Sequence, residues 1–208
     1  GNSSSLAVVT GGARGIGLGC AKSLVAKGFN IVLVDVLEDE LNEAVRTLRA
    51  TGMHAESFVA DVSGFQKAQD VVEEILERYE SIDVLVNNAG TPMPKGLLDI
   101  SEDEWDRTID VHLKGCFNWS RAVVPSMLRV GSGRIVNISS ISAYSGGVTR
   151  AVSKFAYAAA KAGILGMTRS LAKELGPSVT VNAVCPGAIK TELTGDMLER
   201  RSAEFTEG

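Results

Sequence analysis

Tyr157 and Lys161, separated by three alanines, form the residue pair in this chain with the clearest capacity for chemistry. On an α-helix this spacing places the phenol and the ammonium on the same face. A lysine beside a tyrosine favours the phenolate, so proton exchange nearer neutral pH becomes feasible. The same spacing also occurs on ordinary solvated helix faces. Its meaning therefore depends on the segments that surround the pair in the fold.

A glycine-rich segment follows the first predicted strand. The apolar run at residues 6–10 leads into residues 11–17, and a helical pattern continues over 16–27. Strand, glycine turn and helix in this order form a phosphate cradle, because small residues admit a pyrophosphate and a helix N-terminus favours its charge. A tight turn between packed elements is the alternative interpretation. The residues predicted to bind a dinucleotide here are Gly11, Arg14, Gly15, Ile16 and Gly17.

The next predicted strand, residues 30–35, ends in a carboxylate. Asp35 lies 18 residues after Gly17, close to the separation expected for an acid that binds the adenosine ribose of a dinucleotide. This carboxylate would repel the 2′-phosphate of NADP, whereas Arg14 offers that phosphate a cation. The sequence therefore predicts NAD as the cofactor, with NADP as the less favoured alternative.

With these motifs in place, the chain resembles the short-chain dehydrogenase/reductase family from about Leu6 to Thr194. The matching segments are residues 10–17, 61–62, 87–90, 137–140, Tyr157 with Lys161, and 186–191. The resemblance implies hydride transfer between NAD(P) and a secondary alcohol or ketone. It also implies that Ser140 binds the substrate oxygen and Tyr157 exchanges its proton. Lys161 would perturb Tyr157 and hold the nicotinamide ribose, so Tyr157 and Lys161 also belong to the cofactor site.

Three further segments are implied to bind the cofactor. Residues 88–90 would lie beside the adenosine, residues 61–62 would contact the adenine, and residues 186–191 would close over the nicotinamide. Each also has a plainer interpretation, respectively as a strand-ending turn, a helix cap and an ordinary loop. The predicted residues are Asp61, Val62, Asn88, Ala89, Gly90, Pro186, Gly187, Ile189 and Thr191.

His112 departs from the family pattern, which usually has an asparagine at this position. That asparagine helps to hold a water that relays protons from the lysine. An imidazole also donates and accepts hydrogen bonds, so we expect that His112 could keep the relay and count it among the candidate catalytic residues. A packed core histidine is the alternative.

Strand-like runs alternate with helical patterns along the chain. This rhythm predicts an α/β fold, a single doubly wound Rossmann domain over residues 6–208 with helices on both faces of a parallel sheet. Residues 1–5 are expected to be a flexible start or a tag remnant. Family members usually continue beyond Gly208, so the last strand and the lid are expected to be missing from this sequence. The predicted strands are 6–10, 30–35, 54–59, 84–87, 133–138 and 180–184, and the predicted helices 16–27, 38–51, 64–79, 101–130 and 154–175.

Composition narrows the class of partner. The 208 residues carry a net charge of −4, which argues against a nucleic-acid partner, and no apolar stretch is long enough to cross a bilayer. We therefore expect a cytoplasmic enzyme acting on a small-molecule alcohol or ketone. The three cysteines read as buried thiols, and the pattern of ligand residues predicts no metal. By resemblance, the chain should form a homodimer or homotetramer.

Three functions remain open at this stage. Asp35 favours NAD-linked oxidation of a secondary alcohol such as a sugar or polyol. Arg14 keeps open an NADPH-dependent 3-oxoacyl thioester reductase. A non-catalytic dinucleotide-binding regulatory protein is the third, although such a protein has no need of the proton donor at Tyr157.

Overall fold

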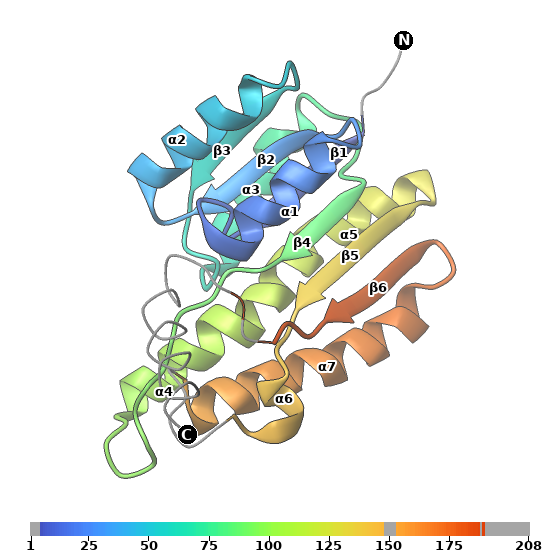
Figure 1. Cartoon of the computed structure of the whole chain (residues 1–208). Helices are drawn as coiled ribbons and strands as arrows, with labels where there is room; N and C mark the ends of the chain where they lie inside the picture. The colour runs from blue at the N-terminus through green and yellow to red at the C-terminus, as the bar shows by residue number, and fades with distance from the viewer. Residues whose placement is uncertain (1–4, 148–152, 188, 190–208) are drawn as a thin grey trace, which may run out of the picture.

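The computed structural model describes residues 5–147, 153–187 and 189. Within these residues six strands alternate with helices, as the repeating apolar runs predict (Figure 1). The strands are β1 (Leu6–Thr10), β2 (Asn30–Asp35), β3 (Ala55–Val59), β4 (Val84–Asn87), β5 (Gly133–Ile138) and β6 (Val179–Val184). The helices are α1 (Gly15–Val25), α2 (Glu38–Arg49), α3 (Phe65–Leu76), α4 (Glu102–Ile109), the π-helical turn η1 (Asp110–Lys114), α5 (Gly115–Val130), α6 (Ser142–Ser145) and α7 (Phe155–Leu175).

The strands form one parallel sheet in the order β3-β2-β1-β4-β5-β6. Val8 in the centre of β1 pairs with Val32 of β2 on one side and with Leu85 of β4 on the other. The winding reverses between β1 and β4, and in open α/β sheets this switch point creates a crevice at the carboxyl ends of the strands. The predicted doubly wound fold is therefore confirmed.

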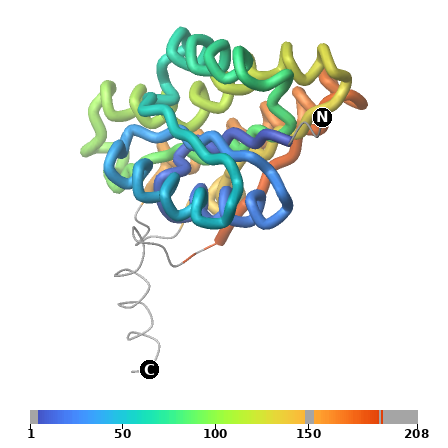
Figure 2. The backbone as a smooth tube through the Cα atoms, turned by 90° about the horizontal axis from the view of Figure 1, so that it is seen from above, coloured from blue at the N-terminus to red at the C-terminus, as the bar shows by residue number. Residues whose placement is uncertain are grey.

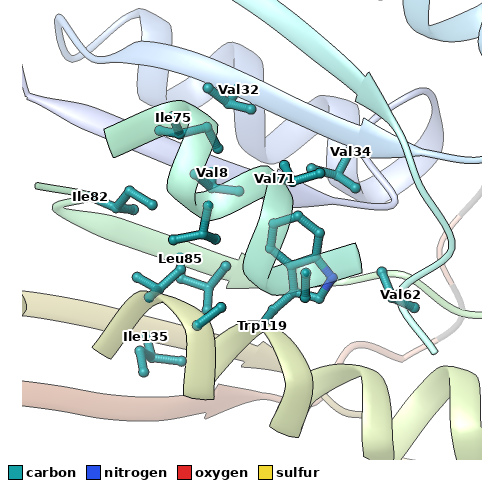
Figure 3. Packing of buried hydrophobic residues seen from close by; sticks show 14 of the residues in the cluster. Val8, Val32, Val34, Val62, Val71, Ile75, Ile82, Leu85, Trp119 and Ile135 are labelled. Atoms are coloured by element: carbon teal, nitrogen blue, oxygen red, sulfur yellow. The ribbon is translucent and has the colours of Figure 1, made fainter. Parts of the chain in front are cut away.

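Helices cover both faces of the sheet, and a hydrophobic core lies under each layer. Helices α1 and α2 pack on one face, and α3, α5 and α7 pack on the other (Figure 2). Side chains alternate along β1, so Val8 enters one core while Ala7 and Val9 enter the other. Trp119 is fully buried and lies among the apolar side chains that α3 and the strands contribute (Figure 3). Burial on both faces explains why the central strands are almost continuously apolar.

The helix ends follow their sequence signals. Ser101 and Glu104 form the predicted capping box at the start of α4, and Gly176 ends α7 before Pro177. The predicted continuous helix over residues 101–130 is wrong in one respect, because η1 interrupts it between α4 and α5. The short helix α6 was not predicted either. Both irregular elements lie beside the candidate site.

Candidate active site

The candidate residues that the structure describes come from segments that follow the carboxyl ends of the strands. The glycine turn follows β1, residues 88–90 follow β4, Ser140 follows β5, and Pro186 follows β6. Helix α7 contributes Tyr157 and Lys161. The fold thus brings into one crevice segments that are far apart in the sequence. Thr191 lies outside the described residues.

The glycine turn is shaped to receive an anion. Gly11 and Gly15 have φ angles of 61° and 57°, which glycine adopts without the strain of a side chain. A Cβ on Gly17 would overlap the carbonyl oxygen of Gly11, so the turn is tightly closed. The N-cap residue Arg14 makes no side-chain cap, and the first turn of α1 contains no acidic residue. The N-terminal amides of α1 are therefore suited to a pyrophosphate.

Thr10 and Asn88 hold the glycine turn against the segment that follows β4. The Thr10 hydroxyl accepts hydrogen bonds from the backbone N–H groups of Asn88 and Ala89, at 3.0 and 3.2 Å. In return, the Asn88 amide donates to the carbonyl oxygens of Thr10 and Gly11, at 3.2 and 3.0 Å. The side chain of Asn88 is thus engaged with protein, and its part in the site is to fix two loops relative to each other.

Asp35 lies at the end of β2 and also contacts the glycine turn. Its Oδ2 accepts a hydrogen bond from the backbone N–H of Ala13 at 3.1 Å, and its Oδ1 accepts one from Val36 at 2.8 Å. The next residue, Leu37, also donates to Oδ1. All three donors are backbone N–H groups, so these hydrogen bonds bring no cation to the carboxylate of Asp35.

Asp61, predicted to contact adenine, is held from two directions. Its Oδ1 accepts hydrogen bonds from the N–H and hydroxyl of Ser63, at 2.9 and 2.7 Å, and its Oδ2 pairs with the Arg107 guanidinium at 2.8 Å. Partial burial raises the pKa of Asp61, but the bonds from Ser63 and Arg107 outweigh it and bring the pKa below its usual value. Helix capping does not describe Asp61, because Gly64 is the N-cap of α3. Val62 beside it is buried.

Ser140, Tyr157 and Lys161 meet at the carboxyl end of β5. The Ser140 hydroxyl accepts a hydrogen bond from the backbone N–H of Ser142 at 3.1 Å and shares a side-chain hydrogen bond with Tyr157. The Lys161 ammonium lies 5.6 Å from the centre of the Tyr157 ring and donates to the carbonyl oxygen of Ile138 at 2.7 Å. The three residues therefore form one cluster, as the family register predicts.

The pKa of Tyr157 differs from the sequence-based expectation. Burial raises this pKa above 10, and the hydrogen bond with Ser140, which acts to lower it, does not offset the burial. Burial also lowers the pKa of Lys161 to about 8, because the ammonium is enclosed with little solvent around it. The pKa of Tyr157 is therefore raised, with burial as its largest cause, although the Lys161 ammonium lies 5.6 Å from the ring centre.

His112 lies within η1 and is only 1% exposed. A π-helical turn inside an α-helix is rare and often marks a functional site. Burial, reinforced by the nearby positive charge of Lys161, lowers the pKa of His112 to about 3, so the ring is neutral at physiological pH. The sequence predicted a candidate relay residue here, and the structure places it in contact with Tyr157, at 5.0 Å between ring centres.

Residues after β6 line the other side of Ser140. The backbone N–H of Ile141 donates to the carbonyl oxygen of Pro186 at 3.1 Å, which ties the segment after β5 to the segment after β6. Gly187 is exposed beside Ile141, and Ile189 is 43% exposed. Pro186 and Gly187 thus lie beside Ile141, the residue after Ser140, and their predicted contact with the nicotinamide stays a prediction, as does that of Ile189.

Sequence reasoning did not assign a role to three residues that shape this site. They are Thr10, within the matching segment 10–17, Ser139, within the matching segment 137–140, and Arg107, which lies in none of the matching segments. The Ser139 hydroxyl donates to the Lys161 carbonyl oxygen at 2.8 Å and so anchors α7 to β5. In the sequence, Thr10 is marked by its hydroxyl at the end of a strand whose other residues are all apolar. No sequence pattern marks Arg107, because its ion pair with Asp61 joins two residues that are far apart in the sequence.

Comparison with known proteins agrees with this geometry. The family described as short chain dehydrogenase matches residues 5–202. The chain belongs to the short-chain dehydrogenase family. It is an oxidoreductase of this family, whose members use NAD(P).

Two curated relatives are similar over most of its length. The short-chain reductase protein NovJ of Streptomyces niveus is 41% identical, covering 94% of this chain and 73% of the relative. The 3-oxoacyl-[acyl-carrier-protein] reductase FabG of Thermotoga maritima is 37% identical, covering 93% and 77%.

Solved short-chain dehydrogenase structures share the fold closely. A variant of actinorhodin polyketide ketoreductase with NADPH superposes with a TM-score of 0.87 at 35% identity, covering 96% of this chain and 76% of that one. NAD+-bound xylitol dehydrogenase superposes with a TM-score of 0.86 at 30% identity, covering 97% and 76%. The family thus includes proteins similar to this chain that are bound to either cofactor.

The part of the chain that the structure describes lacks two kinds of feature. In that part of the chain, no helix is long and apolar enough to span a membrane. Likewise, the described residues contain no cluster of three potential metal ligands. Cys116 is buried as predicted, whereas Cys20 and Cys185 are only half-buried, and all three thiols are free.

Proposed function

We propose that this protein reduces a ketone to a secondary alcohol with NADH, and that Tyr157 donates the proton. The observation that carries the proposal is the cluster at the end of β5, in which the Tyr157 phenol shares a hydrogen bond with Ser140 and lies 5.6 Å from the Lys161 ammonium. A protonated phenol is the form that donates to a developing alkoxide, whereas oxidation needs the phenolate as a base. The likeness to NovJ and FabG, both named as reductases, supports the reductive direction.

Each residue of the cluster has a distinct task in this reaction. Ser140, whose hydroxyl meets Tyr157, would hold the substrate carbonyl oxygen within reach of the phenol. Tyr157 would transfer its proton to that oxygen as the carbonyl carbon is reduced. Lys161, positively charged below its pKa of about 8, would favour the phenolate left behind. The bound cofactor supplies the hydride.

NADH is preferred in this proposal because of the charge at the end of β2. Asp35 presents a carboxylate there, and Val36 and Leu37 add no cation to balance a 2′-phosphate. Arg14 lies at the start of α1, and its side chain makes no cap there. The guanidinium of Arg14 at this position is the feature that favours NADPH instead. Binding of both cofactors must therefore be measured.

The substrate class that best fits the segments next to Ser140 and Tyr157 is a 3-oxoacyl compound. The loop that follows β4 contains Pro92, Met93 and Pro94, and Met93 is fixed at the start of α7 by hydrogen bonds with Ser153 and Lys154, at 3.1 and 2.8 Å. After Ser140, the side chains of Ile141 and Tyr144 are 50% and 74% exposed. A substrate pocket walled by these residues would be largely apolar, which suits an acyl or aromatic chain more than a polyhydroxylated one. The likeness to FabG and NovJ supports this choice.

Oxidation of a sugar or polyol is the second candidate. Asp35 favours it, because an NAD preference accompanies such oxidations, and the likeness to NAD+-bound xylitol dehydrogenase agrees.

Assembly into a dimer or tetramer remains a prediction from the family resemblance.

The experiment that separates these functions is a matched pair of assays on the purified chain. We expect reduction of acetoacetyl-CoA with NADH at pH 7, with a tighter dissociation constant for NADH than for NADPH. Xylitol oxidation with NAD+ that exceeds this reduction would support the second candidate and refute the first. Tight binding of NADH without turnover of any ketone or polyol would indicate the regulatory protein instead.

A further inference from the structure

The π-helical turn η1 directs one residue into the space between Tyr157 and the loop after β4. His112 lies in this turn, and its imidazole is buried. The next residue, Leu113, packs against Gly163 of α7, where a Cβ would lie 2.9 Å from a Leu113 methyl carbon. The turn is therefore fixed against the helix that carries the proton donor, and the placement of His112 is determined by packing.

One ring nitrogen of His112 contacts the backbone of Thr91. Its Nε2 lies 2.7 Å from the Thr91 carbonyl oxygen and 3.2 Å from the Thr91 backbone nitrogen. A single imidazole nitrogen either donates or accepts, so the two contacts cannot both be hydrogen bonds. The shorter contact indicates the tautomer in which Nε2–H donates to the Thr91 carbonyl. Thr91 begins the loop that contains Met93, and His112 thus holds the start of a wall of the substrate pocket.

The same ring packs against Tyr157 on its other side. The two ring centres are 5.0 Å apart and the planes meet at 87°, the edge-to-face arrangement that aromatic rings favour. Gly90 permits this placement, because a Cβ there would lie 2.6 Å from the His112 Cε1. The ring of His112 is consequently confined between Gly90 and Tyr157, and it limits the orientations open to the phenol.

We propose that His112 is a positioning residue that couples the orientation of the Tyr157 phenol to the substrate loop at Thr91, acting as a neutral imidazole. The proposal rests on the proposed function, since it takes Tyr157 as the proton donor. An asparagine at this position could hold Thr91 but would place no ring against Tyr157. The imidazole combines the two tasks in one side chain.

The surroundings of His112 explain why the ring stays neutral. The titratable groups that face it are Lys161 and Tyr157 on α7 and Cys116 on α5, whose thiol donates to the His112 carbonyl oxygen at 3.2 Å. Lys161 is a buried cation, and within the part of the chain that the structure describes no carboxylate contributes to the pKa of His112 to compensate a second positive charge. Passing a proton through the ring would also require Nε2 to release Thr91. Positioning is therefore favoured over a relay.

Two substitutions separate the two tasks of His112. His112→Asn keeps a donor for Thr91 but removes the ring, so kcat for ketone reduction should fall about tenfold or more while KM for the ketone changes little. His112→Phe keeps a ring against Tyr157 but loses the bond to Thr91, so KM should rise about fivefold while kcat changes less. Wild-type kcat in His112→Asn, or equal effects of both variants on kcat and KM, would overturn the coupling.

Controls distinguish this role from general damage to the fold. Melting temperature and the NADH dissociation constant are measured for both variants, with His54→Asn as the matched control, because His54 is the only other histidine. Gly90→Ala provides an approach from the opposite side of the ring, and it should reproduce the kcat loss of His112→Asn. If His112→Phe does not fold, the comparison of His112→Asn with Gly90→Ala still decides the proposal.

A spectroscopic measurement tests the state of the ring without turnover. In the NADH complex labelled with ¹⁵N-histidine, His54→Gln leaves a single histidine to assign. We expect the Nε2–H tautomer with nitrogen shifts that do not move between pH 6 and pH 9. Titration in that range, or the Nδ1–H tautomer, would overturn the neutral role. Loss of turnover in Tyr157→Phe together with wild-type kinetics in both His112 variants would refute the positioning role alone, whereas full turnover in Tyr157→Phe would refute the proposed function.

Discussion

Replacing Thr10 by valine tests whether a single hydroxyl joins the two halves of the cofactor crevice. The Thr10 side chain is buried, with 2% exposed, and its hydroxyl accepts two backbone hydrogen bonds from the segment after β4. It also donates to the Val86 carbonyl oxygen at 3.4 Å. Valine has nearly the same shape and suits a strand, so the substitution removes these bonds with little other change.

The expected cost follows from the number of bonds lost. Each hydrogen bond contributes about 1 kcal/mol, and the N–H groups of Asn88 and Ala89 would lose their partner in a partly buried site. The added methyl group restores about 1 kcal/mol through apolar burial. Thr10→Val should therefore lower the free energy of unfolding by about 2 to 3 kcal/mol, and the melting temperature by about 4 to 10 °C.

The same substitution should weaken cofactor binding. Asn88 also donates to the Gly11 carbonyl oxygen, so loosening the segment after β4 displaces the glycine turn. We expect the NADH dissociation constant to rise about tenfold, which corresponds to about 1.4 kcal/mol. Urea unfolding and fluorescence titration of NADH measure the two effects. Thr180→Val, at an exposed position of β6, is the matched control and should change stability by less than about 0.5 kcal/mol.

The reasoning would be refuted by a Thr10→Val protein that unfolds at the same urea concentration as the wild type and binds NADH equally well. A loss of stability with unchanged NADH affinity would show that the hydroxyl stabilises the sheet but does not organise the glycine turn.

Three other substitutions test the site. Tyr157→Phe should lower kcat at least about a hundredfold and leave the NADH dissociation constant nearly unchanged; near-normal turnover would contradict the assignment. Folding lowers the pKa of Lys161 from 10.5 to about 8, so the buried charge destabilises the protein most below pH 8, and this effect fades as the pH approaches 10.5. Lys161→Met should then abolish most turnover yet raise the unfolding free energy at pH 7 by about 2 to 3 kcal/mol, a gain that urea unfolding should no longer detect near pH 10.5; equal stability at pH 7 would argue against a charged, buried lysine. Asp35→Ser should weaken NADH and strengthen NADPH binding in parallel titrations, and an unchanged ratio of the two constants would remove the basis for the NAD preference.

Local patterns were sufficient to predict most of the fold. The apolar runs at β1, β2, β4 and β5 have the predicted bounds, because each is a buried parallel strand enclosed by turn or helix signals. The predicted start of β3 is off by one residue, as is that of β6, where the sheet edge leaves the alternation weaker. The sequence also predicts that Ser140, Tyr157 and Lys161 lie together, as they do in the structure, because their spacing is local or follows a strand end.

Features that depend on tertiary packing could not be predicted. The pair between Asp61 and Arg107 joins residues from two separate segments, and no short-range pattern marks it. The direction of the Tyr157 pKa depends on how deeply the phenol is buried, and a spacing of four residues carries no information about burial. Likewise, η1 depends on the fit of His112 beside Gly90, which exists only once β4 and α7 are in place.

The π-helical turn also has a consequence for the helical phase of the segment from α4 to α5. One residue in an α-helix corresponds to a rotation of about 100°, and η1 sets the rotation of α4 relative to α5. Before the turn, α4 presents Arg107 to Asp61; after it, α5 buries Trp119 in the core. A single-residue deletion within 110–114 would let the helix run straight but would rotate one of these side chains out of its place. Residues 110–114 thus set the rotation between the two helices, and we expect a change of length there to lower the stability of the fold.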